Sequence, residues 1–271
     1  MSNETEKIIK ELMNAYAEGG SFSNEETAYD YIDLAAEATS KKKKLEYLNK
    51  ALELEPDNLD AASLIAQENA KRPGDLLDTL PPLIEKGNKL MADYLRDDVG
   101  EFWLLFETRP YMRLRHLYMN VLYECGMMRK AVAEAKEMLK LCKGDNLGVR
   151  YDLMHLYAYL EEEKAALALH KKYGSHEETQ MLLPLAVLYY KKGDFDSSLS
   201  YLQRLWKVNK DTKKFFTAVN NGTLDQYFGD MSPYGYQPDC IGELIYEFTD
   251  YKFLFETVKY FFVWAKKNLK K

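Results

Sequence analysis

Two short segments of the chain carry arginines in a setting that suits the binding of a carboxylate. Glu107–Arg113 reads Glu-Thr-Arg-Pro-Tyr-Met-Arg, and Asp145–Tyr151 reads Asp-Asn-Leu-Gly-Val-Arg-Tyr. A guanidinium group is a planar fork that binds two oxygens at once, so two of them beside amide and tyrosine side chains suit a carboxylate. The segments are therefore candidates for binding an acidic, partly aromatic peptide segment.

The alternative is that these arginines pair within the chain. Arg109, Arg113 and Arg150 would then form ion pairs with acidic side chains and hold an inserted segment against the rest of the fold. The acidic partners expected for this arrangement are Glu101, Glu107 and Glu124.

No residue pattern predicts catalysis or a bound metal. The chain has no glycine-rich phosphate loop, no Gly-x-Ser-x-Gly sequence and no His-Glu-x-x-His pair. No two histidines are three or four residues apart, the spacing that places side chains together on one helical turn. They are His116, His155, His170 and His176. The carboxylates Glu161–Glu163 fall in a predicted turn, where a solvated surface is the better interpretation.

The cysteines predict neither a disulfide framework nor a zinc site. Cys125, Cys142 and Cys240 are odd in number and far apart in sequence. We expect them to be reduced and partly buried. Together with the absence of catalytic motifs, this predicts a non-enzymatic protein without cofactor or metal.

Composition indicates a folded chain and narrows the classes of partner. The 271 residues are 46% hydrophobic and 30% charged, with a formal net charge of −6 and a pI near 5.5. An acidic chain is not attracted to phosphate backbones, so nucleic acid is not an expected partner. Met1–Leu12 has no apolar run typical of a signal peptide, and no stretch is long enough to span a membrane. We expect a cytoplasmic location and no membrane partner.

Two stretches, Arg113–Lys143 and Gln180–Lys210, repeat one pattern of an apolar-striped helix, a glycine, a small residue and a second striped helix. In the first, Gly126 ends the first helix and Ala131 is the small residue that lets two helices approach closely. This pattern is typical of tetratricopeptide helix hairpins, which bury their apolar faces by stacking on copies of themselves.

A third, less regular unit lies between these two. A period of 34 and then 33 residues places the turns of the three units at Gly126, Leu160 and Gly193. Ala165 would be the small residue of the middle unit, and Ser198 that of the last one.

The N-terminal part fits two degenerate units. Glu25–Asn58 would form one pair, with Ser23 and Glu26 as a capping box and Lys41–Lys44 in the turn. A further hairpin starts at Leu59. Its second half, Asp75–Leu95, contains Pro81 and Pro82, which predict a kinked helix or two short helices. An insertion is expected around Asp97–Tyr111.

The period is lost after Asn209, and residues 215–264 contain 15 aromatic side chains. A terminal repeat needs an atypical cap because its outer face has no neighbour. We expect an irregular loop over Thr223–Pro238 and one or two closing helices over Asp239–Leu269, whose rings cover the last repeat. The alternative is a dimer interface built from these rings.

The predicted fold is therefore all-α, a right-handed superhelical solenoid of antiparallel helix pairs with an irregular aromatic-rich C-terminal cap. It forms one solenoid over residues 1–271, with degenerate repeats over 1–100, an insertion and three repeats over 101–210, and the cap over 211–271.

In tetratricopeptide geometry the first helix of each pair lines a concave groove, with the exposed positions near 2, 5, 9 and 12 of each unit. Leu183 is placed there by this register. The residues predicted to bind a partner are Arg113, His116, Asn120, Tyr123, Arg150, Met154, Tyr157, Val187 and Tyr190. The function expected from such a groove is a scaffold or adaptor that holds a protein or peptide segment. The alternative is a regulatory sensor that binds a small anionic ligand or signalling peptide.

At the two arginine segments the chain resembles a broad group of bacterial tetratricopeptide-repeat proteins. They share ETRPYMR-like and DNxGxRY-like segments and a tyrosine-glycine stretch before a final helix, here Tyr234–Gly235. The C-terminal repeats are more loosely similar to those of the suppressor-of-tumorigenicity-seven family. The similarity covers roughly residues 25–265. Some relatives carry a zinc-binding SEC-C module, whose clustered cysteines are absent here, so the resemblance implies the fold and no metal.

Overall fold

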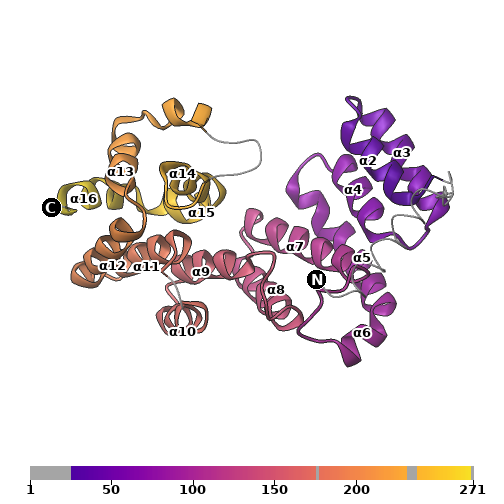
Figure 1. The fold of residues 1–271 in the computed structure, drawn as a ribbon, viewed down its shortest axis with the longest axis horizontal. Helices are drawn as coiled ribbons and strands as arrows, with labels where there is room; N and C mark the ends of the chain where they lie inside the picture. The colour runs from indigo at the N-terminus through magenta and orange to yellow at the C-terminus, as the bar shows by residue number, and fades with distance from the viewer. Residues whose placement is uncertain (1–25, 175–176, 231–236, 270–271) are drawn as a thin grey trace, which may run out of the picture. The chain divides into compact units, whose positions relative to one another are not determined.

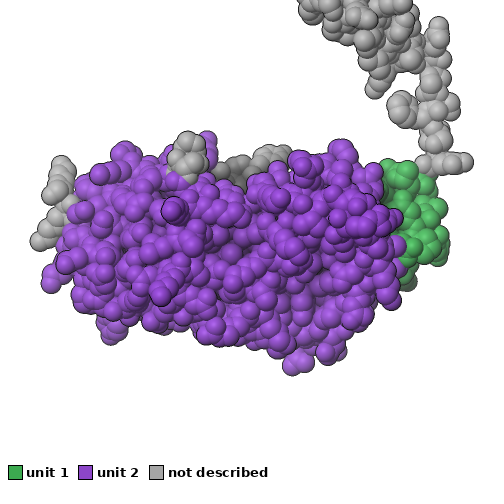
Figure 2. Space-filling view, turned by 90° about the horizontal axis from the view of Figure 1, so that it is seen from below, with its two compact units in different colours: residues 1–68 green, residues 69–271 purple. Residues whose placement is uncertain are grey.

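The computed structural model describes residues 26–174, 177–230 and 237–269, and every regular element in these ranges is a helix (Figure 1). The chain divides into two compact units, residues 1–68 and residues 69–271, which Figure 2 colours separately. The all-α prediction is confirmed. A single solenoid over residues 1–271 stays a prediction. In the described ranges no helix combines the length and the apolar character needed to cross a membrane.

The first unit contains the helix pair expected over Glu25–Asn58. Its helices are α2 (Ala28–Glu37) and α3 (Lys41–Leu54), followed by α4 (Leu59–Asn69). Small residues such as Ala28, Ala51 and Ala61 form the centre of its core. The capping box is made by Thr27 and Asp30. Ser23, expected to cap this helix, lies outside the described residues.

The lysine run was placed in the wrong element by sequence. Lys41–Lys44 forms the first turn of α3, and the inter-helix turn is the shorter stretch of residues 38–40. Ser40 caps α3 by accepting a hydrogen bond from the Lys43 amide (3.3 Å). Because a serine cap can start a helix directly after a short turn, the run stays helical and solvated.

The second unit begins with a 3-10 turn (Pro73–Asp75), α5 (Leu76–Leu90) and α6 (Ala92–Asp97). The predicted break is present, but it falls at Met91 rather than at the prolines. Pro81 and Pro82 both lie inside α5. Residues 98–108 then form turns, as expected for an insertion, with isolated bridges from Gly100 and Glu101 to Cys142.

Three antiparallel helix pairs follow, as the repeat pattern predicts. The first pair is α7 (Arg109–Glu124) with α8 (Met128–Leu141), and the second is α9 (Val149–Leu160) with α10 (Glu163–Tyr173). The third is α11 (Thr179–Lys191) with α12 (Phe195–Val208).

Small residues occupy the close contacts within these pairs. Ala131 is fully buried, and the Ser198 hydroxyl donates to the Ala186 carbonyl oxygen (2.7 Å). In the middle pair the buried small residue is Ala166 and not Ala165, which is half-buried. The middle pair is thus shifted by one residue from the predicted register.

The same one-residue shift is visible in the turns. Gly126, Glu161 and Gly193 all have positive φ values, 75°, 59° and 76°. The middle turn therefore falls at Glu161 and not at Leu160, so the turns are 35 and 32 residues apart. Glu161 occupies the left-handed conformation for which the flanking units use glycine.

The C-terminal cap, residues 212–269, contains more helix than expected. Its elements are α13 (Thr212–Asn221), a 3-10 segment η2 (Leu224–Asp230), α14 (Ile241–Asp250), α15 (Lys252–Phe255), a 3-10 turn (Glu256–Val258) and α16 (Lys259–Asn268). The 3-10 segment lies within the predicted irregular loop, and the closing segment is three helices rather than one or two. Tyr234–Gly235 lies outside the described residues.

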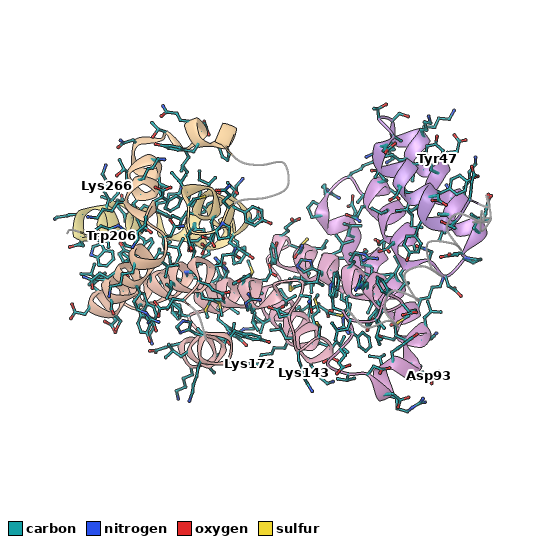
Figure 3. The ribbon with its side chains drawn as sticks, in the orientation of Figure 1. Tyr47, Asp93, Lys143, Lys172, Trp206 and Lys266 are labelled. Carbon is teal, nitrogen blue, oxygen red and sulfur yellow. The ribbon has the colours of Figure 1, made fainter. Side chains whose placement is uncertain are left out.

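The aromatic rings of the cap pack mainly on one another. Ring centroids 5.3–6.3 Å apart link Phe215, Phe216, Phe248, Phe255, Phe261 and Phe262. Figure 3 draws the side chains of the cap, with Lys266 of α16 labelled. From this cluster α14 extends to pack against α11, and α15 packs against α9. The cap therefore folds back onto first helices of the repeats, which the sequence pattern did not predict.

We predict that Glu161→Gly stabilises the protein. A non-glycine residue in the left-handed region costs about 1–2 kcal/mol, whereas glycine costs roughly 0.5–1 kcal/mol through its greater freedom in the unfolded chain. The free energy of unfolding, measured with urea, should therefore rise by about 0.5 kcal/mol, the difference between these two costs.

The matched control is Gly193→Ala, which places a side chain at φ 76° and should lower the free energy of unfolding by about 1 kcal/mol. The Glu161–Lys191 ion pair (3.4 Å) is half exposed at Glu161 and contributes little. A loss of stability in Glu161→Gly would show that this backbone is not strained.

Candidate functional site

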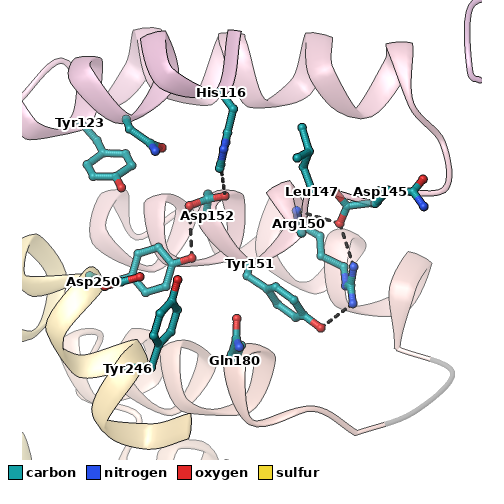
Figure 4. A pocket seen from close by; sticks show the side chains of 14 residues that line it. His116, Tyr123, Asp145, Leu147, Arg150, Tyr151, Asp152, Gln180, Tyr246 and Asp250 are labelled. Atoms are coloured by element: carbon teal, nitrogen blue, oxygen red, sulfur yellow. Dashed lines mark hydrogen bonds and ion pairs between the residues drawn. The ribbon is translucent and has the colours of Figure 1, made fainter. Parts of the chain in front are cut away.

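A cavity of about 510 Å³ lies among α7, α9, the start of α11 and α14 (Figure 4). We call it the groove pocket, because it opens between the first helices of the repeats and the cap. Its lining residues come from four places in the second unit. They are His116, Asn120 and Tyr123 of α7; Asp145, Asn146, Leu147 and Gly148 of the turn before α9; Arg150, Tyr151 and Asp152 of α9; and Gln180, Tyr246, Asp250 and Tyr251.

One wall is built by the turn that leads into α9. Asp145 has φ 50°, and its Oδ2 accepts hydrogen bonds from the Arg150 amide (3.1 Å) and from Arg150 Nη1 (2.9 Å). Gly148 has φ 73°, and a Cβ there would lie 3.2 Å from the Tyr151 ring. The Asp-x-x-Gly-x-Arg-Tyr spacing is therefore required to start this helix and to hold Arg150 in place.

Arg150 is engaged by partners within the chain. It donates to Glu178 Oε1 (3.2 Å) and to the Tyr151 hydroxyl, and its guanidinium lies 4.0 Å from the Tyr151 ring centroid. Burial opposes its charge, but the hydrogen bonds to Glu178 and Asp145 raise the pKa of Arg150 above its usual value. Arg150 therefore forms ion pairs within the chain, as the alternative interpretation of the sequence expected. Its partners are Asp145 and Glu178 and not the expected Glu101, Glu107 or Glu124.

Asp152 lies at the centre of the pocket. Its Oδ1 accepts a hydrogen bond from the Tyr251 hydroxyl (3.2 Å), and its Oδ2 lies 3.5 Å from His116 Nε2. Burial raises the pKa of Asp250, and the nearby Asp152 carboxylate raises it further. Burial, followed by the charges of Asp152, Glu124 and Asp250, likewise raises the pKa of Tyr123. Burial is the largest cause of both shifts, and a hydrogen bond from Tyr246 partly offsets the rise in the pKa of Asp250.

Two hydrogen-bond acceptors in the pocket have no donor among the described residues. They are Oδ1 of Asn120 and Oδ1 of Asp145, and both atoms are buried. Nε2 of His116 is a third buried atom of the lining without a hydrogen-bond partner among the described residues. A buried acceptor without a partner costs about 1–3 kcal/mol, so native structures rarely keep one without another use. These atoms mark the pocket as a place where a donor group can bind.

The wall contributed by α14 is attached to α9 by a fully buried pair, His155 and Glu247. His155 Nε2 lies 3.0 Å from Glu247 Oε1, and His155 Nδ1 lies 2.8 Å from the Tyr151 carbonyl oxygen. Since a carbonyl only accepts, Nδ1 carries a proton, and Nε2 of a neutral ring must accept one from Glu247. Burial lowers the pKa of His155 to about 3 and raises the pKa of Glu247 well above 4.5.

Stacking completes this attachment. The Tyr251 ring stacks on the His155 ring with centroids 3.6 Å apart and an interplanar angle of 13°. Phe253 packs against Tyr123 of α7 and Tyr159 of α9, with centroids 5.2 and 5.7 Å apart. The cap thereby supplies Tyr246, Asp250 and Tyr251 to the groove pocket.

The structure brings four of the nine predicted binding residues into this pocket, His116, Asn120, Tyr123 and Arg150. Arg113 is exposed on α7 outside the lining, and Tyr190 packs against Phe261 and Trp264 of the cap. The remaining predicted residues, Met154, Tyr157 and Val187, are buried, as is Leu183.

The one-residue shift of the middle unit explains the error in α9. One residue rotates a helix face by about 100°. Residues one position later, Tyr151 and His155, therefore face the pocket and the cap, whereas Met154 and Tyr157 point into the core. The cap residues Tyr246 and Asp250 could not be found, because no periodic pattern links them to the repeats.

The Glu107–Arg113 segment serves the fold rather than this site. The buried Thr108 hydroxyl donates to the carbonyl oxygens of Phe102 and Leu105. Arg109 Nε donates to the Trp103 carbonyl oxygen (2.9 Å), and its guanidinium lies 4.0 Å from the Phe106 ring centroid. These contacts hold the insertion against the start of α7, as the alternative interpretation of the arginines expected. Arg109 does so through a backbone carbonyl and an aromatic ring, whereas ion pairs were expected.

The described lining residues include no serine, threonine, cysteine or lysine that would act as a nucleophile. Within the described ranges, no group of three or more histidine, cysteine, aspartate or glutamate side chains is arranged to hold a metal ion. What the pocket offers is hydrogen-bond acceptors, carboxylates and aromatic rings, which are groups that bind.

No protein-family model matches the chain, and no curated protein sequence matches it. Among solved structures, the chain is similar to the crystal structure of YrrB, described as a TPR protein with an unusual peptide-binding site. The TM-score is 0.41 and the sequence identity 17%, over 68% of this chain and 87% of that chain. The helical repeat is shown by the helix pairs of the chain itself. Function is inferred from the geometry of the groove pocket.

We predict that Glu247→Gln changes how stability depends on pH. In the folded protein the His155–Glu247 pair holds one proton. In the unfolded chain Glu247 ionises near pH 4.5 and His155 near pH 6.5. Glutamine keeps the donor to His155 Nε2 but removes the need for a proton on residue 247.

The sign follows from proton counts. The wild-type pair is most favourable between about pH 4.5 and 6.5, because the unfolded chain holds two protons below that window and none above it. In the variant only His155 titrates, so its stability falls below pH 6.5 and is flat above. Above pH 4.5 the free energy of unfolding of the variant, relative to that of the wild type, should rise by up to about 1.4 kcal/mol per pH unit. The rise ends when Glu247 ionises in the folded wild-type protein.

Urea unfolding of both proteins across this pH range measures the difference directly. The control is Glu256→Gln, the same replacement at an exposed glutamate of the cap. Its free energy of unfolding should differ from that of the wild type by a constant amount across this pH range. A flat difference for Glu247→Gln would show that the folded pair does not hold the proton.

Proposed function

We propose that the protein is a non-enzymatic scaffold or adaptor that binds a segment of a partner protein in the groove pocket. The observation that carries this proposal is a cavity of about 510 Å³ in which Oδ1 of Asn120 and Oδ1 of Asp145 are buried and have no donor. A volume between about 300 and 1,000 Å³ is usual for a ligand site in a protein, and it accommodates a small number of side chains.

The helix arrangement supports the same function. First helices of stacked pairs present side chains for recognition on one face. Here α14 and α15 already pack on α11 and α9, so the exposed part of that face is reduced to the pocket beside α7. A partner would therefore insert a short segment at one end rather than lie along three repeats.

The sensor for a small anionic ligand receives less support. Three aspartates line the pocket, whereas its one arginine already has carboxylate partners in Asp145 and Glu178. An anion entering the pocket would meet an excess of negative charge, which opposes its binding.

We predict that Leu147→Trp abolishes peptide binding. Leu147 lines the pocket from the turn before α9, and the larger indole would occupy cavity volume. Peptides selected on the wild-type protein from a random display library should bind the variant at least about tenfold more weakly, equivalent to about 1.4 kcal/mol. Titration calorimetry measures the two dissociation constants.

The matched control is Ala168→Trp, which adds the same side chain at an exposed position of α10 and should leave binding unchanged. Melting curves close to that of the wild type establish that both variants are folded. If selected peptides bind Leu147→Trp as tightly as the wild type, the groove pocket is not the binding site. The proposal would then be wrong.

A further inference from the structure

The chemistry of the groove pocket is uneven, and one end of it is strongly acidic. This acidic end is formed by Asn120, Tyr123, Asp152, Tyr246 and Asp250. Figure 4 shows Tyr123, Asp152, Tyr246 and Asp250 on the side of the pocket away from Arg150. Arg150 lies at the other end, where Asp145 and Glu178 neutralise it. The two carboxylates of the acidic end have no cation of the chain within ion-pair distance other than His116, 3.5 Å from Asp152, among the residues described.

We propose that the acidic end of the groove pocket binds the positively charged end of an arginine or lysine side chain of the partner segment. This inference rests on the proposed function and names the chemistry of its ligand. It also reverses the charge of the partner expected from the arginines in the sequence.

The hydrogen-bonding groups favour such a ligand. Oδ1 of Asn120 is an acceptor without a donor, and an ionised carboxylate has acceptors only. A guanidinium or ammonium group consists of donors alone, so it matches acceptors that the chain leaves unpaired. Asp145 Oδ1 is a further buried acceptor without a donor, on a side chain that is only 1% exposed, at the opposite side of the pocket.

The rings at this end also suit a cation. Arg150 lies over the Tyr151 ring, His155 covers one face of Tyr251, and Phe253 packs against Tyr123. Tyr123 and Tyr246 flank the carboxylates Asp152 and Asp250 and add the negative potential of their ring faces.

The net charge of the chain, −6, acts in the same direction over a longer range. An acidic protein attracts basic segments and speeds their encounter.

The test begins with peptides selected on the wild-type protein from a random display library, as above. Those that lose binding to Leu147→Trp are kept, and each arginine is replaced by citrulline and each lysine by glutamine. Removing the cationic residue that enters the pocket should weaken binding about tenfold or more, the effect of one charge-assisted hydrogen bond.

Asp250→Asn provides the protein side of the same test. It removes one charge at a partly exposed position and should weaken the cationic peptides about tenfold, yet hardly change their citrulline or glutamine versions. Asp152→Asn is the second variant, and Asp196→Asn, at an exposed position of α12, is the matched control without effect. Comparing arginine with lysine in one peptide separates the two sources of the charge.

The outcomes separate the two proposals. Pocket-dependent peptides whose binding needs no cationic residue, or is unaffected by Asp250→Asn and Asp152→Asn, overturn this inference and leave the proposed function in place. Absence of any pocket-dependent peptide overturns both. If the selected peptides are acidic and bind through Arg150, this inference is wrong and the partner is acidic, as the sequence predicted.

Discussion

The groove pocket depends on one buried proton. His155 and Glu247 have no exposed surface and lie 3.0 Å apart, and only a shared proton lets both remain uncharged in a medium that solvates charge poorly. Because Glu247 lies on α14 and His155 on α9, this pair places Tyr246 and Asp250 opposite Asn120 and Tyr123. The stacking of Tyr251 on His155 and the packing of Phe253 on Tyr123 and Tyr159 complete the attachment of the cap.

The pocket leaves buried polar atoms unpaired. Oδ1 of Asn120 on α7 and Oδ1 of Asp145 before α9 have no hydrogen-bond partner among the described residues, and neither has Oε2 of Glu247 at the attachment of the cap. A sequence selected for stability alone would replace Asn120 with an apolar residue of similar volume, since an unpaired buried acceptor is unfavourable. Retention of the amide next to two carboxylates is most simply explained by a ligand that supplies the donors.

The repeats were largely predictable, and the site only in part. Gly126 and Gly193 reveal two turns because only glycine adopts the left-handed conformation at little cost, but Glu161 adopts it with no mark in the sequence. The resulting one-residue error left His116, Asn120 and Tyr123 of α7 in the pocket but rotated α9, so Met154 was assigned to the face that His155 occupies. The contact between Asp152 and Tyr251 joins residues 99 positions apart, and a hydrogen bond of that range follows from tertiary packing, not from periodicity.

The packing of the cap against α9 and α11 also determines how selectively the groove pocket can bind a side chain. An open groove of stacked first helices contacts an extended peptide at many weakly selective points, but a pocket closed by α14 desolvates one side chain and demands that its polar groups be matched. A neutral side chain would leave the negative charges of Asp152 and Asp250 uncompensated, and a carboxylate would add repulsion. Only a donor-rich cation satisfies the acceptors and the charge together. Because its contacts would come from both α7 and α14, its binding would also stabilise the docked cap by mass action.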